Sequence, residues 1–269
     1  MTTSRDGLRL ETRVAIDAVE QALELARRRV GAEDITAKGA RDVVTATDLA
    51  VEDAVRAIVR DALASPVIGE ERGGERPADG SPYWLVDPIC GTRNFASGMP
   101  LYCVNLALVE GDQVTVAVVG DPSTGEIHAA ERGRGAWALT DGARRALTTS
   151  DESRTIVIED GKSKDRRREQ AAQFIAAAVR ADRWDFRSLG TTLASPYLAA
   201  GRISAYVVFW VSAVHAGAGS LLVTEAGGTL SDIGGRPWTI RSDSLVASAN
   251  PDLHEEMLGL ARAASARPE

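Results

Sequence analysis

Three short stretches of the sequence carry side chains whose types and positions suit the binding of a hard metal ion. They are Thr45-Ala46-Thr47-Asp48, Ile68-Gly69-Glu70-Glu71 and Asp87-Pro88-Ile89. Each lies where an expected helix or strand meets a loop, which is the usual place for side chains to enter a shared cleft. Carboxylates together with a backbone carbonyl are ligands that suit Mg²⁺. A single acidic residue beside a turn is commonly a cap or a solvated group, so the prediction depends on the three stretches occurring together.

The composition favours a compact protein that acts on a small molecule. A chain of 269 residues is long enough for a substantial core, and its net charge of -7 gives nucleic acid or an anionic membrane no electrostatic attraction. We therefore expect a small-molecule substrate, with neither nucleic acid nor a membrane as partner. Two cysteines make no disulfide framework, and no apolar run approaches the roughly 18 residues that span a bilayer. Because the first residues also lack a signal-peptide pattern, we expect a cytoplasmic protein.

Hydrophobic periodicity predicts the elements that position these stretches. Apolar residues recur every three and four positions over residues 8–30, which indicates an amphipathic helix. A second helix should begin at a cap provided by Thr47 or Asp48 and end before Pro66. Residues 72–81 resemble an exposed loop or lid. Residues 101–108 and 113–119 predict an antiparallel hairpin that turns at Gly111-Asp112.

The C-terminal half alternates between helical and strand patterns, as an α/β unit does. Helices are expected near residues 171–179 and 213–226, with a strand at 204–209. We divide the chain into an N-terminal α+β subdomain, residues 1–145, which carries the phosphate and metal motif, and a C-terminal α/β subdomain, residues 146–269. Both belong to one compact globular unit. His128 and His254 are interpreted as surface or packing residues, and Cys103 as a core residue.

Two longer stretches resemble the signatures of the inositol monophosphatase family. Residues 83–95 are similar to W-x-x-D-P-I-D-G-T-x-N-F, and residues 214–228 are similar to W-D-x-A-A-G-x-x-x-V-x-E-A-G-G. The glycine-containing turns at 125–126, 131–136 and 199–202 also match the family pattern. The resemblance covers most of residues 8 to 260. On this basis the chain is identified as a divergent member of the family.

The resemblance implies a layered αβαβα sandwich of the inositol monophosphatase and fructose-bisphosphatase type. Such proteins are usually homodimers, hydrolyse small phosphate monoesters with Mg²⁺ and are inhibited by lithium. One metal is expected at Glu70, Asp87 and the carbonyl of Ile89, where Glu70 and Thr92 help to activate the attacking water. The amides of Gly91 and Thr92 are expected to receive the phosphate, and Asp48 to position Thr92.

The chain departs from the family at two aspartates that bind a second metal. Cys90 and His215 stand in their places, and of that ligand set only Asp87 remains. Magnesium binds thiolate and neutral imidazole poorly, so the second magnesium site should be lost or altered. Val208 stands where the family has a glutamate that contacts the polyol, and Trp210 adds apolar surface. Inositol phosphate is therefore not the expected substrate. Arg93 could bind a substrate anion.

The two replacements leave four interpretations open. In the first, the site has decayed to that of a catalytically inactive pseudophosphatase or binding protein, with Cys90 as a space-filler. In the second, Asp87, Cys90 and His215 hold a softer ion such as Zn²⁺. In the third, His215 protonates the leaving oxygen in place of the second metal. In the fourth, the pocket serves a non-hydrolytic biosynthetic reaction on a non-phosphorylated metabolite, with His215 as acid or base and Cys90 as nucleophile or partner. We favour the third interpretation, an altered phosphomonoesterase that uses one magnesium ion.

Overall fold

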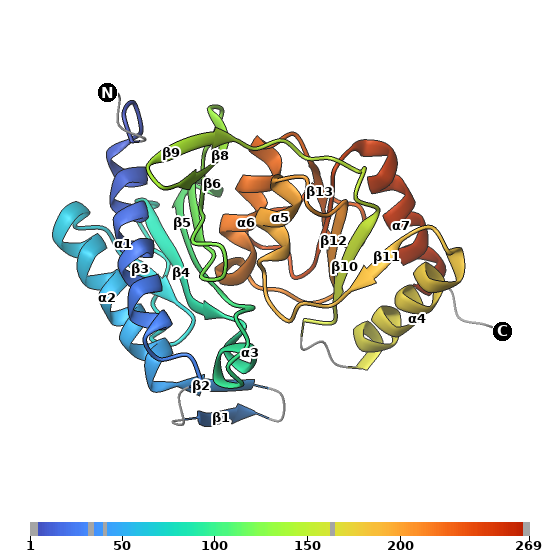
Figure 1. The fold of residues 1–269 in the computed structure, drawn as a ribbon, viewed down its shortest axis with the longest axis horizontal. Coiled ribbons are helices and arrows are strands. Elements are labelled where there is room, and N and C mark those ends of the chain that lie inside the picture. Colours follow the sequence, from blue (N-terminus) through green and yellow to red (C-terminus); the bar gives the residue numbers. More distant parts are fainter. Residues whose placement is uncertain (1–4, 32–34, 40–41, 162–164, 266–269) are drawn as a thin grey trace.

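The computed structural model describes residues 5–31, 35–39, 42–161 and 165–265, and these residues form five layers (Figure 1). Helices α1 (Leu10–Arg27) and α2 (Ala46–Leu63) cover the outer face of a seven-stranded sheet. Helices α5 (Ala194–Ala199) and α6 (Ala213–Glu225) lie between this sheet and a five-stranded sheet. Helices α4 (Asp165–Ala181) and α7 (Pro251–Ser265) cover the far side. The predicted αβαβα sandwich is confirmed.

The seven-stranded sheet holds the strands that lead into the site. Its order is β3-β4-β5-β6-β7-β8-β9, and its neighbouring strands are antiparallel except for the parallel pair β3 and β4. The strands are β3 (Val67–Gly69), β4 (Tyr83–Cys90), β5 (Cys103–Glu110), β6 (Gln113–Gly120), β7 (Ile127–Glu131), β8 (Gly135–Thr140) and β9 (Ala143–Ala146). The predicted hairpin is β5 and β6, with Glu110 paired to Gln113 across the turn.

The five-stranded sheet mixes parallel and antiparallel pairs in the order β11-β10-β12-β14-β13. Its strands are β10 (Thr155–Glu159), β11 (Asp185–Arg187), β12 (Ala205–Val208), β13 (Thr229–Ser231) and β14 (Leu245–Ser248). The central strand β12 runs parallel to β10 and antiparallel to β14. A separate two-stranded hairpin, β1 (Ile35–Gly39) and β2 (Asp42–Thr45), lies beside the short helix α3 (Thr92–Ala96). The subdomain boundary at residue 145 stays a prediction.

The start of α2 differs from the sequence-based expectation. The N-cap is Thr45, and Asp48 is the third helical residue rather than the cap. The two residues form a capping box, because the Asp48 carboxylate accepts the backbone N–H of Thr45 while the Thr45 hydroxyl accepts the N–H of Asp48. This arrangement leaves the other carboxylate oxygen of Asp48 available to the site. The helix ends as expected before Pro66, with Ala64 in the left-handed conformation.

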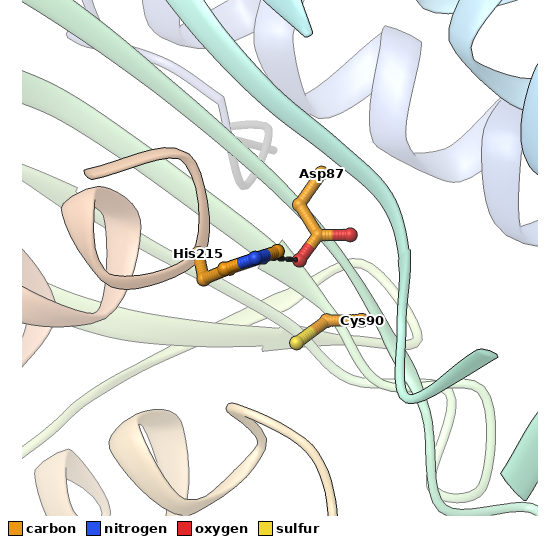
Figure 2. A group of neighbouring side chains, drawn as sticks. All are labelled: Asp87, Cys90 and His215. Atoms are coloured by element: carbon orange, nitrogen blue, oxygen red, sulfur yellow. Dashed lines mark hydrogen bonds and ion pairs between the residues drawn. The ribbon is translucent and has the colours of Figure 1, made fainter. Parts of the chain in front are cut away.

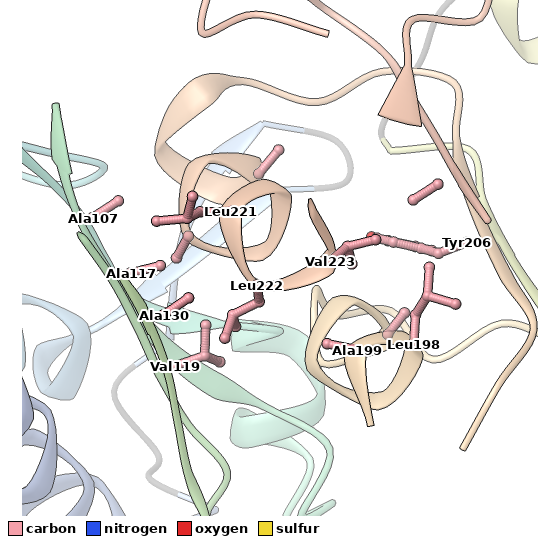
Figure 3. Close-up of a cluster of buried hydrophobic side chains, with 14 of the residues drawn as sticks. Ala107, Ala117, Val119, Ala130, Leu198, Ala199, Tyr206, Leu221, Leu222 and Val223 are labelled. Atoms are coloured by element: carbon pink, nitrogen blue, oxygen red, sulfur yellow. The ribbon is translucent and has the colours of Figure 1, made fainter. Parts of the chain in front are cut away.

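The central helix α6 is apolar on all sides because both sheets and α5 surround it. Figure 3 shows Leu221, Leu222 and Val223 between small side chains of the first sheet, such as Ala117, and Tyr206 of β12. A helix that is hydrophobic all round is expected to be buried. This packing fixes the first turn of α6 against β4 and β5. In the part of the chain that the structure describes, no helix combines the length and apolar character needed to cross a bilayer.

The two remaining histidines are packing residues and do not lie on the surface. His128 on β7 is 0 % exposed and His254 on α7 is 5 % exposed. The His254 ring is hydrogen-bonded to the hydroxyl of Ser231 at 2.9 Å. Burial lowers the pKa of His128 to about 4, although the carboxylate of Glu126 lies 3.5 Å from its ring. Cys103 is fully buried, as predicted.

Candidate active site

A cavity of about 510 Å³ lies where the end of β4 faces the second sheet and the start of α6. Nearly all the residues that the sequence indicated line this cavity, and they are Glu70, Asp87, Ile89, Cys90, Gly91, Thr92, Arg93, Val208, Trp210 and His215. Asp48 is fully buried and reaches the site through Thr92. The tertiary structure thus brings together residues from the loop after β3 and from β4, α3, β12 and α6.

The end of β4 presents three of these residues, Asp87, Ile89 and Cys90, through an irregular backbone. The pairing of β4 with β5 shifts between Asp87 and Cys90, which displaces the intervening Pro88-Ile89 segment from the regular ladder. Gly91 follows with a φ of +105°, a conformation that an L-residue rarely adopts. A Cβ at this position would lie 2.9 Å from the Leu101 carbonyl oxygen. Glycine is therefore required where the chain turns from β4 into α3.

Thr92 is held in place by two acceptors. Its hydroxyl lies 3.0 Å from Oδ1 of Asp48 and 3.0 Å from the carbonyl oxygen of Ile89. Because a hydroxyl has one proton, it donates to one of these oxygens at a time. Burial raises the pKa of Asp48, while the bonds from Thr45 and Thr92 favour its ionised form. Asp48 thus connects the capping box of α2 to the Thr92 side chain.

Glu70 lies in a loop whose backbone is hydrogen-bonded to the buried carboxylate of Glu52. Glu52 on α2 is 0 % exposed and accepts the backbone N–H groups of Glu71 and Arg72 at 2.8 and 3.0 Å. Glycine suits position 69 because the Cβ of any other residue there would lie 2.0 Å from the Glu52 carboxylate. Lys38 on the β1–β2 hairpin donates to Glu71 at 2.6 Å.

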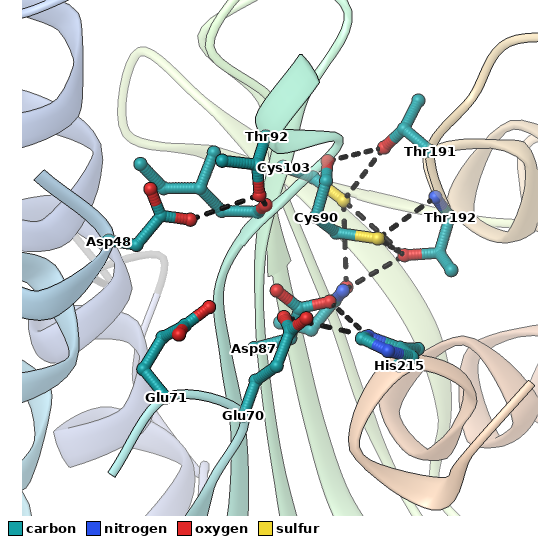
Figure 4. A network of polar contacts seen from close by, with 12 residues as sticks. Asp48, Glu70, Glu71, Asp87, Cys90, Thr92, Cys103, Thr191, Thr192 and His215 are labelled. Atoms are coloured by element: carbon teal, nitrogen blue, oxygen red, sulfur yellow. Dashed lines mark hydrogen bonds and ion pairs between the residues drawn. The ribbon is translucent and has the colours of Figure 1, made fainter. Parts of the chain in front are cut away.

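Asp87 and His215 form an ion pair in the cavity wall (Figure 2), and Glu70 lies beside them (Figure 4). His215 Nδ1 lies 2.7 Å from Asp87 Oδ2 and 3.9 Å from Glu70 Oε2. Burial and the proximity of Asp87 raise the pKa of Glu70 to about 7, and burial raises that of Asp87 to about 7. Burial alone would lower the pKa of His215, but the Asp87 and Glu70 carboxylates raise it to about 10. The imidazole is therefore held in its protonated form.

The Cys90 sulfur accepts hydrogen bonds from Thr192, which precedes α5. The backbone N–H of Thr192 donates to Sγ at 3.3 Å, and its hydroxyl donates at 3.0 Å. Neighbouring Cys103 and burial raise the pKa of the Cys90 thiol well above its usual value. In the absence of a bound metal the thiol is neutral, which disfavours the interpretation of Cys90 as a nucleophile. Asp87, Cys90 and His215 each offer a ligand atom within 4.8 Å of the others.

The side of the cavity formed by the second sheet combines apolar side chains with the carboxylates of Glu159 and Asp160. Val208 is 3 % exposed, and Trp210 is 41 % exposed at the wall. Tyr206 and Val211 are buried and line the same cavity. Arg93 also lines the cavity, with an exposed side chain on α3.

Several residues around the site were missed by reasoning from the sequence. Thr191 donates to the Cys90 carbonyl oxygen at 2.7 Å, and Thr192 contacts the Cys90 sulfur as described above. Glu159 at the end of β10 accepts the backbone N–H of Gly190 at 2.8 Å and also lines the cavity. The Gly-Thr-Thr sequence before α5 was a weak signal for a functional turn. Lys38 carried no signal, because its hairpin is distant in sequence from Glu70 and Glu71.

Comparisons with known proteins agree with this architecture. The model of the inositol monophosphatase family matches residues 8–266. A protein named histidinol-phosphatase from Mycobacterium tuberculosis is 35 % identical over 265 residues, which cover 95 % of this chain and 97 % of that protein. Nus factor SuhB from Pasteurella multocida is 33 % identical over 225 residues, covering 83 % and 84 % of the two chains.

Solved structures of similar proteins share the whole arrangement of layers. An IMPase from Thermotoga maritima superposes with a TM-score of 0.83 and 25 % identity, covering 94 % of this chain and 97 % of that one. The SuhB protein from Bartonella henselae superposes with a TM-score of 0.86 and 24 % identity, covering 94 % and 99 %. Since the family match extends over nearly the entire sequence and the layered fold is shared, the chain belongs to the inositol monophosphatase family.

Proposed function

We propose that this protein hydrolyses a small phosphate monoester other than inositol phosphate. In this proposal Glu70, Asp87 and the Ile89 carbonyl hold one magnesium ion, and His215 protonates the leaving oxygen. The observation that carries the proposal is the ion pair between His215 and Asp87 in the wall of the cavity, 2.7 Å between their nearest atoms. It supplies a positive charge where the family has a second magnesium ion.

The first metal position fits the donors that are present. Asp87 is 0 % exposed, and its Oδ1 has no hydrogen-bond partner among the described residues. A buried carboxylate oxygen without a partner is costly, and a cation would satisfy it. The raised pKa values of Glu70 and Asp87, both about 7, reflect burial and the proximity of acidic neighbours, which a cation would also relieve. When bound, magnesium would supply electrophilic polarisation of the phosphoryl group.

The residues of the turn after β4 are proposed to bind the phosphoryl group. Gly91 and Thr92 line the cavity beside Asp87, and the hydrogen bonds from Thr92 to Asp48 and Ile89 hold the turn in one conformation. Glu70 and Thr92 are proposed to accept the proton of the attacking water and to orient it. The nucleophile side of the reaction therefore uses the same residues that the family resemblance implied.

His215 is proposed to act on the leaving-group side. Its side chain is 19 % exposed, so it is accessible from the cavity while Asp87 contacts its Nδ1 atom. A departing alkoxide is a much stronger base than imidazole, so proton transfer from the imidazolium is favourable. After transfer the neutral ring regains a proton from solvent, because the Asp87 and Glu70 carboxylates raise its pKa.

The substrate is proposed to carry a partly apolar alcohol. Val208 and Trp210 supply apolar surface on one side of the cavity. The carboxylate of Glu159 on the same side already accepts the Ser188 hydroxyl and the Gly190 N–H, so it is less available to several hydroxyl groups of a polyol. The relative named histidinol-phosphatase supports the proposal, since its name indicates a phosphate ester other than inositol phosphate.

The experiment that tests this function measures phosphate release from a panel of monoesters with Mg²⁺, Mn²⁺, Zn²⁺ or chelator. The wild type is compared with His215→Gln on alkyl phosphates and on 4-nitrophenyl phosphate. A general acid contributes about 10²- to 10⁴-fold, so we expect a loss of that size for alkyl esters. The nitrophenolate leaves without protonation, so its hydrolysis should fall much less.

Equal losses on both ester types would show that His215 has no role as the leaving-group acid. Absence of release from every ester, with a folded protein, would contradict phosphatase activity. That result would favour the repurposed reaction or the binding protein considered from the sequence.

A further inference from the structure

We propose that Asp87, Cys90 and His215 form a Zn²⁺-binding site, which shares Asp87 with the oxygen position of Glu70, Asp87 and Ile89 and differs from it in the ligands Cys90 and His215. The three residues come from the end of β4 and the first turn of α6, and all of them line the cavity. Thiolate, imidazole and carboxylate are the ligands typical of zinc. The same set contains only one hard ligand residue, so magnesium has little affinity for it.

The ligand atoms lie at separations that a zinc ion can close. Each of the carboxylate, sulfur and ring nitrogen atoms is within 4.8 Å of the other two. Ligands of one tetrahedral zinc ion are about 3.4 to 3.7 Å apart, given bond lengths of roughly 2.0 to 2.3 Å. The contact of 2.7 Å between His215 Nδ1 and Asp87 Oδ2 must lengthen by less than about 1 Å. A separation of up to 4.8 Å must shorten by about 1 Å, so side-chain rotations have to bring the three ligand atoms together.

The surroundings of the Cys90 sulfur favour a metal-bound thiolate. The Asn105 amide donates to the Thr192 hydroxyl at 2.9 Å, so that the hydroxyl proton is directed to Sγ of Cys90. The Thr192 backbone N–H donates to the same sulfur. Two donors that point at a sulfur stabilise negative charge on it, in the way that outer-shell groups orient metal ligands. A space-filling cysteine would not need this arrangement.

Asp87 provides a second indication of a cation, which a metal ion at either of the two positions would satisfy. It is fully buried, and its Oδ1 atom has no hydrogen-bond partner within the described ranges, while Oδ2 contacts His215. The cavity gives a route for the ion and space for a water molecule or substrate as the fourth ligand. Three protein ligands with one open position are typical of exchangeable or catalytic zinc sites.

The test uses Co²⁺ as a spectroscopic probe for zinc with the full-length protein after treatment with chelator. We expect one equivalent of Co²⁺ per chain, with a sulfur-to-cobalt charge-transfer band that Zn²⁺ abolishes by displacing the cobalt. Cys90→Ser should lose the band. Cys103→Ser is the matched control: Cys103 pairs with Cys90 across β4 and β5 but lies outside the ligand set, so this variant should keep the band.

Two further variants keep the test decisive if Cys90→Ser folds poorly. His215→Gln should lose stoichiometric Zn²⁺ binding in calorimetry while Cys90 remains. Thr192→Val removes the hydroxyl donor and should weaken Zn²⁺ binding by about 10- to 100-fold. Absence of a charge-transfer band from the wild type would overturn the proposal. A band that survives in Cys90→Ser or disappears in Cys103→Ser would overturn it as well.

The consequence for catalysis rests on the proposed function. A zinc ion on His215 prevents this residue from delivering a proton, so Zn²⁺ should inhibit magnesium-supported hydrolysis of alkyl phosphates. Cys90→Ser should retain a larger fraction of its own rate at the same Zn²⁺ concentration. A cobalt band without any hydrolysis would support the site and contradict the phosphatase. Activation of the wild type by Zn²⁺ would support the site and contradict the acid role of His215.

Discussion

His215 in the first turn of α6 and Asp87 at the end of β4 are 128 residues apart in the sequence, yet their side chains meet at 2.7 Å. The contact joins an imidazolium to a buried carboxylate in a cavity that Glu70 also lines. This pair changes the charge of the site, because one positive side chain stands where the family resemblance implies a carboxylate and a second metal ion.

Restoring the family's aspartates should restore the requirement for a second hard ion. The double variant Cys90→Asp with His215→Asp places two more carboxylates beside Asp87, which together suit magnesium. Phosphate release at high Mg²⁺ concentration should rise by at least about tenfold, since a metal ion at a leaving oxygen stabilises the transition state by several kcal/mol. Magnesium titrations of the wild type and the double variant measure this effect. Loss of the native reaction without any gain in hydrolysis would point instead to repurposed chemistry.

Glu52 should control the site although it does not line the cavity. Glu52→Ala leaves the N–H groups of Glu71 and Arg72 without their acceptor and removes the carboxylate that Arg56 contacts at 2.8 Å. Loss of a buried hydrogen-bond acceptor typically costs about 1–3 kcal/mol, so chemical denaturation should show a clear decrease in the free energy of unfolding.

Glu52→Gln tests whether the volume or the charge of the Glu52 side chain matters for stability. Glu52→Gln keeps the side-chain volume and one carbonyl acceptor, so it should be less destabilised than Glu52→Ala. Both variants should need more Mg²⁺ for half-maximal hydrolysis, because the loop that carries Glu70 is less well held. An unchanged magnesium requirement in Glu52→Ala would show that the loop does not depend on this anchor.

Two substitutions distinguish the role of the capping box in stability from the role of Asp48 in holding Thr92. Thr45→Ala removes the cap hydroxyl of α2 and should lower the free energy of unfolding by about 1 kcal/mol, with a small effect on turnover. Asp48→Ala removes a partner of that cap and also the acceptor 3.0 Å from the Thr92 hydroxyl. It should therefore lower both stability and kcat. Equal effects of the two variants on kcat would contradict a role for Asp48 in holding Thr92.

His128 should make the stability of the protein depend on pH. Burial lowers the pKa of His128 from its usual 6.5 to about 4 despite the favourable effect of nearby Glu126, with Arg202 opposing protonation. Between about pH 6.5 and pH 4 the unfolded chain binds a proton that the folded protein does not. Stability should therefore fall as the pH decreases through this window, by up to about 1.4 kcal/mol per pH unit.

The variant His128→Phe isolates this contribution. Neither ring nitrogen of His128 makes a hydrogen bond to another described residue, so an apolar ring loses no such bond. The dependence of the unfolding free energy on pH should become shallower in the variant. His254, whose pKa burial also lowers, is present in both proteins, so the difference between them reports on His128. Identical slopes in wild type and variant would exclude His128 as the cause.

The family, the layered fold and most of the site residues could be predicted from the sequence. Periodicity indicated α1, α2 and the β5–β6 hairpin, because helices and strands impose local repeats on buried residues. The motif around Asp87 indicated the phosphate turn, since Gly91 is required by a local backbone conformation. These features depend on near neighbours in the chain, and local patterns therefore reveal them.

Only the tertiary structure decided how the replaced residues interact. It placed His215 on Asp87, directed the Thr192 hydroxyl to the sulfur of Cys90 and brought Lys38 to Glu71. It also shows that the N-cap of α2 is Thr45, whereas Thr47 or Asp48 was expected. The physical reason is that hydrogen bonds, burial and pKa shifts depend on distances between side chains from separate elements, which the packing of α6 between two sheets fixes.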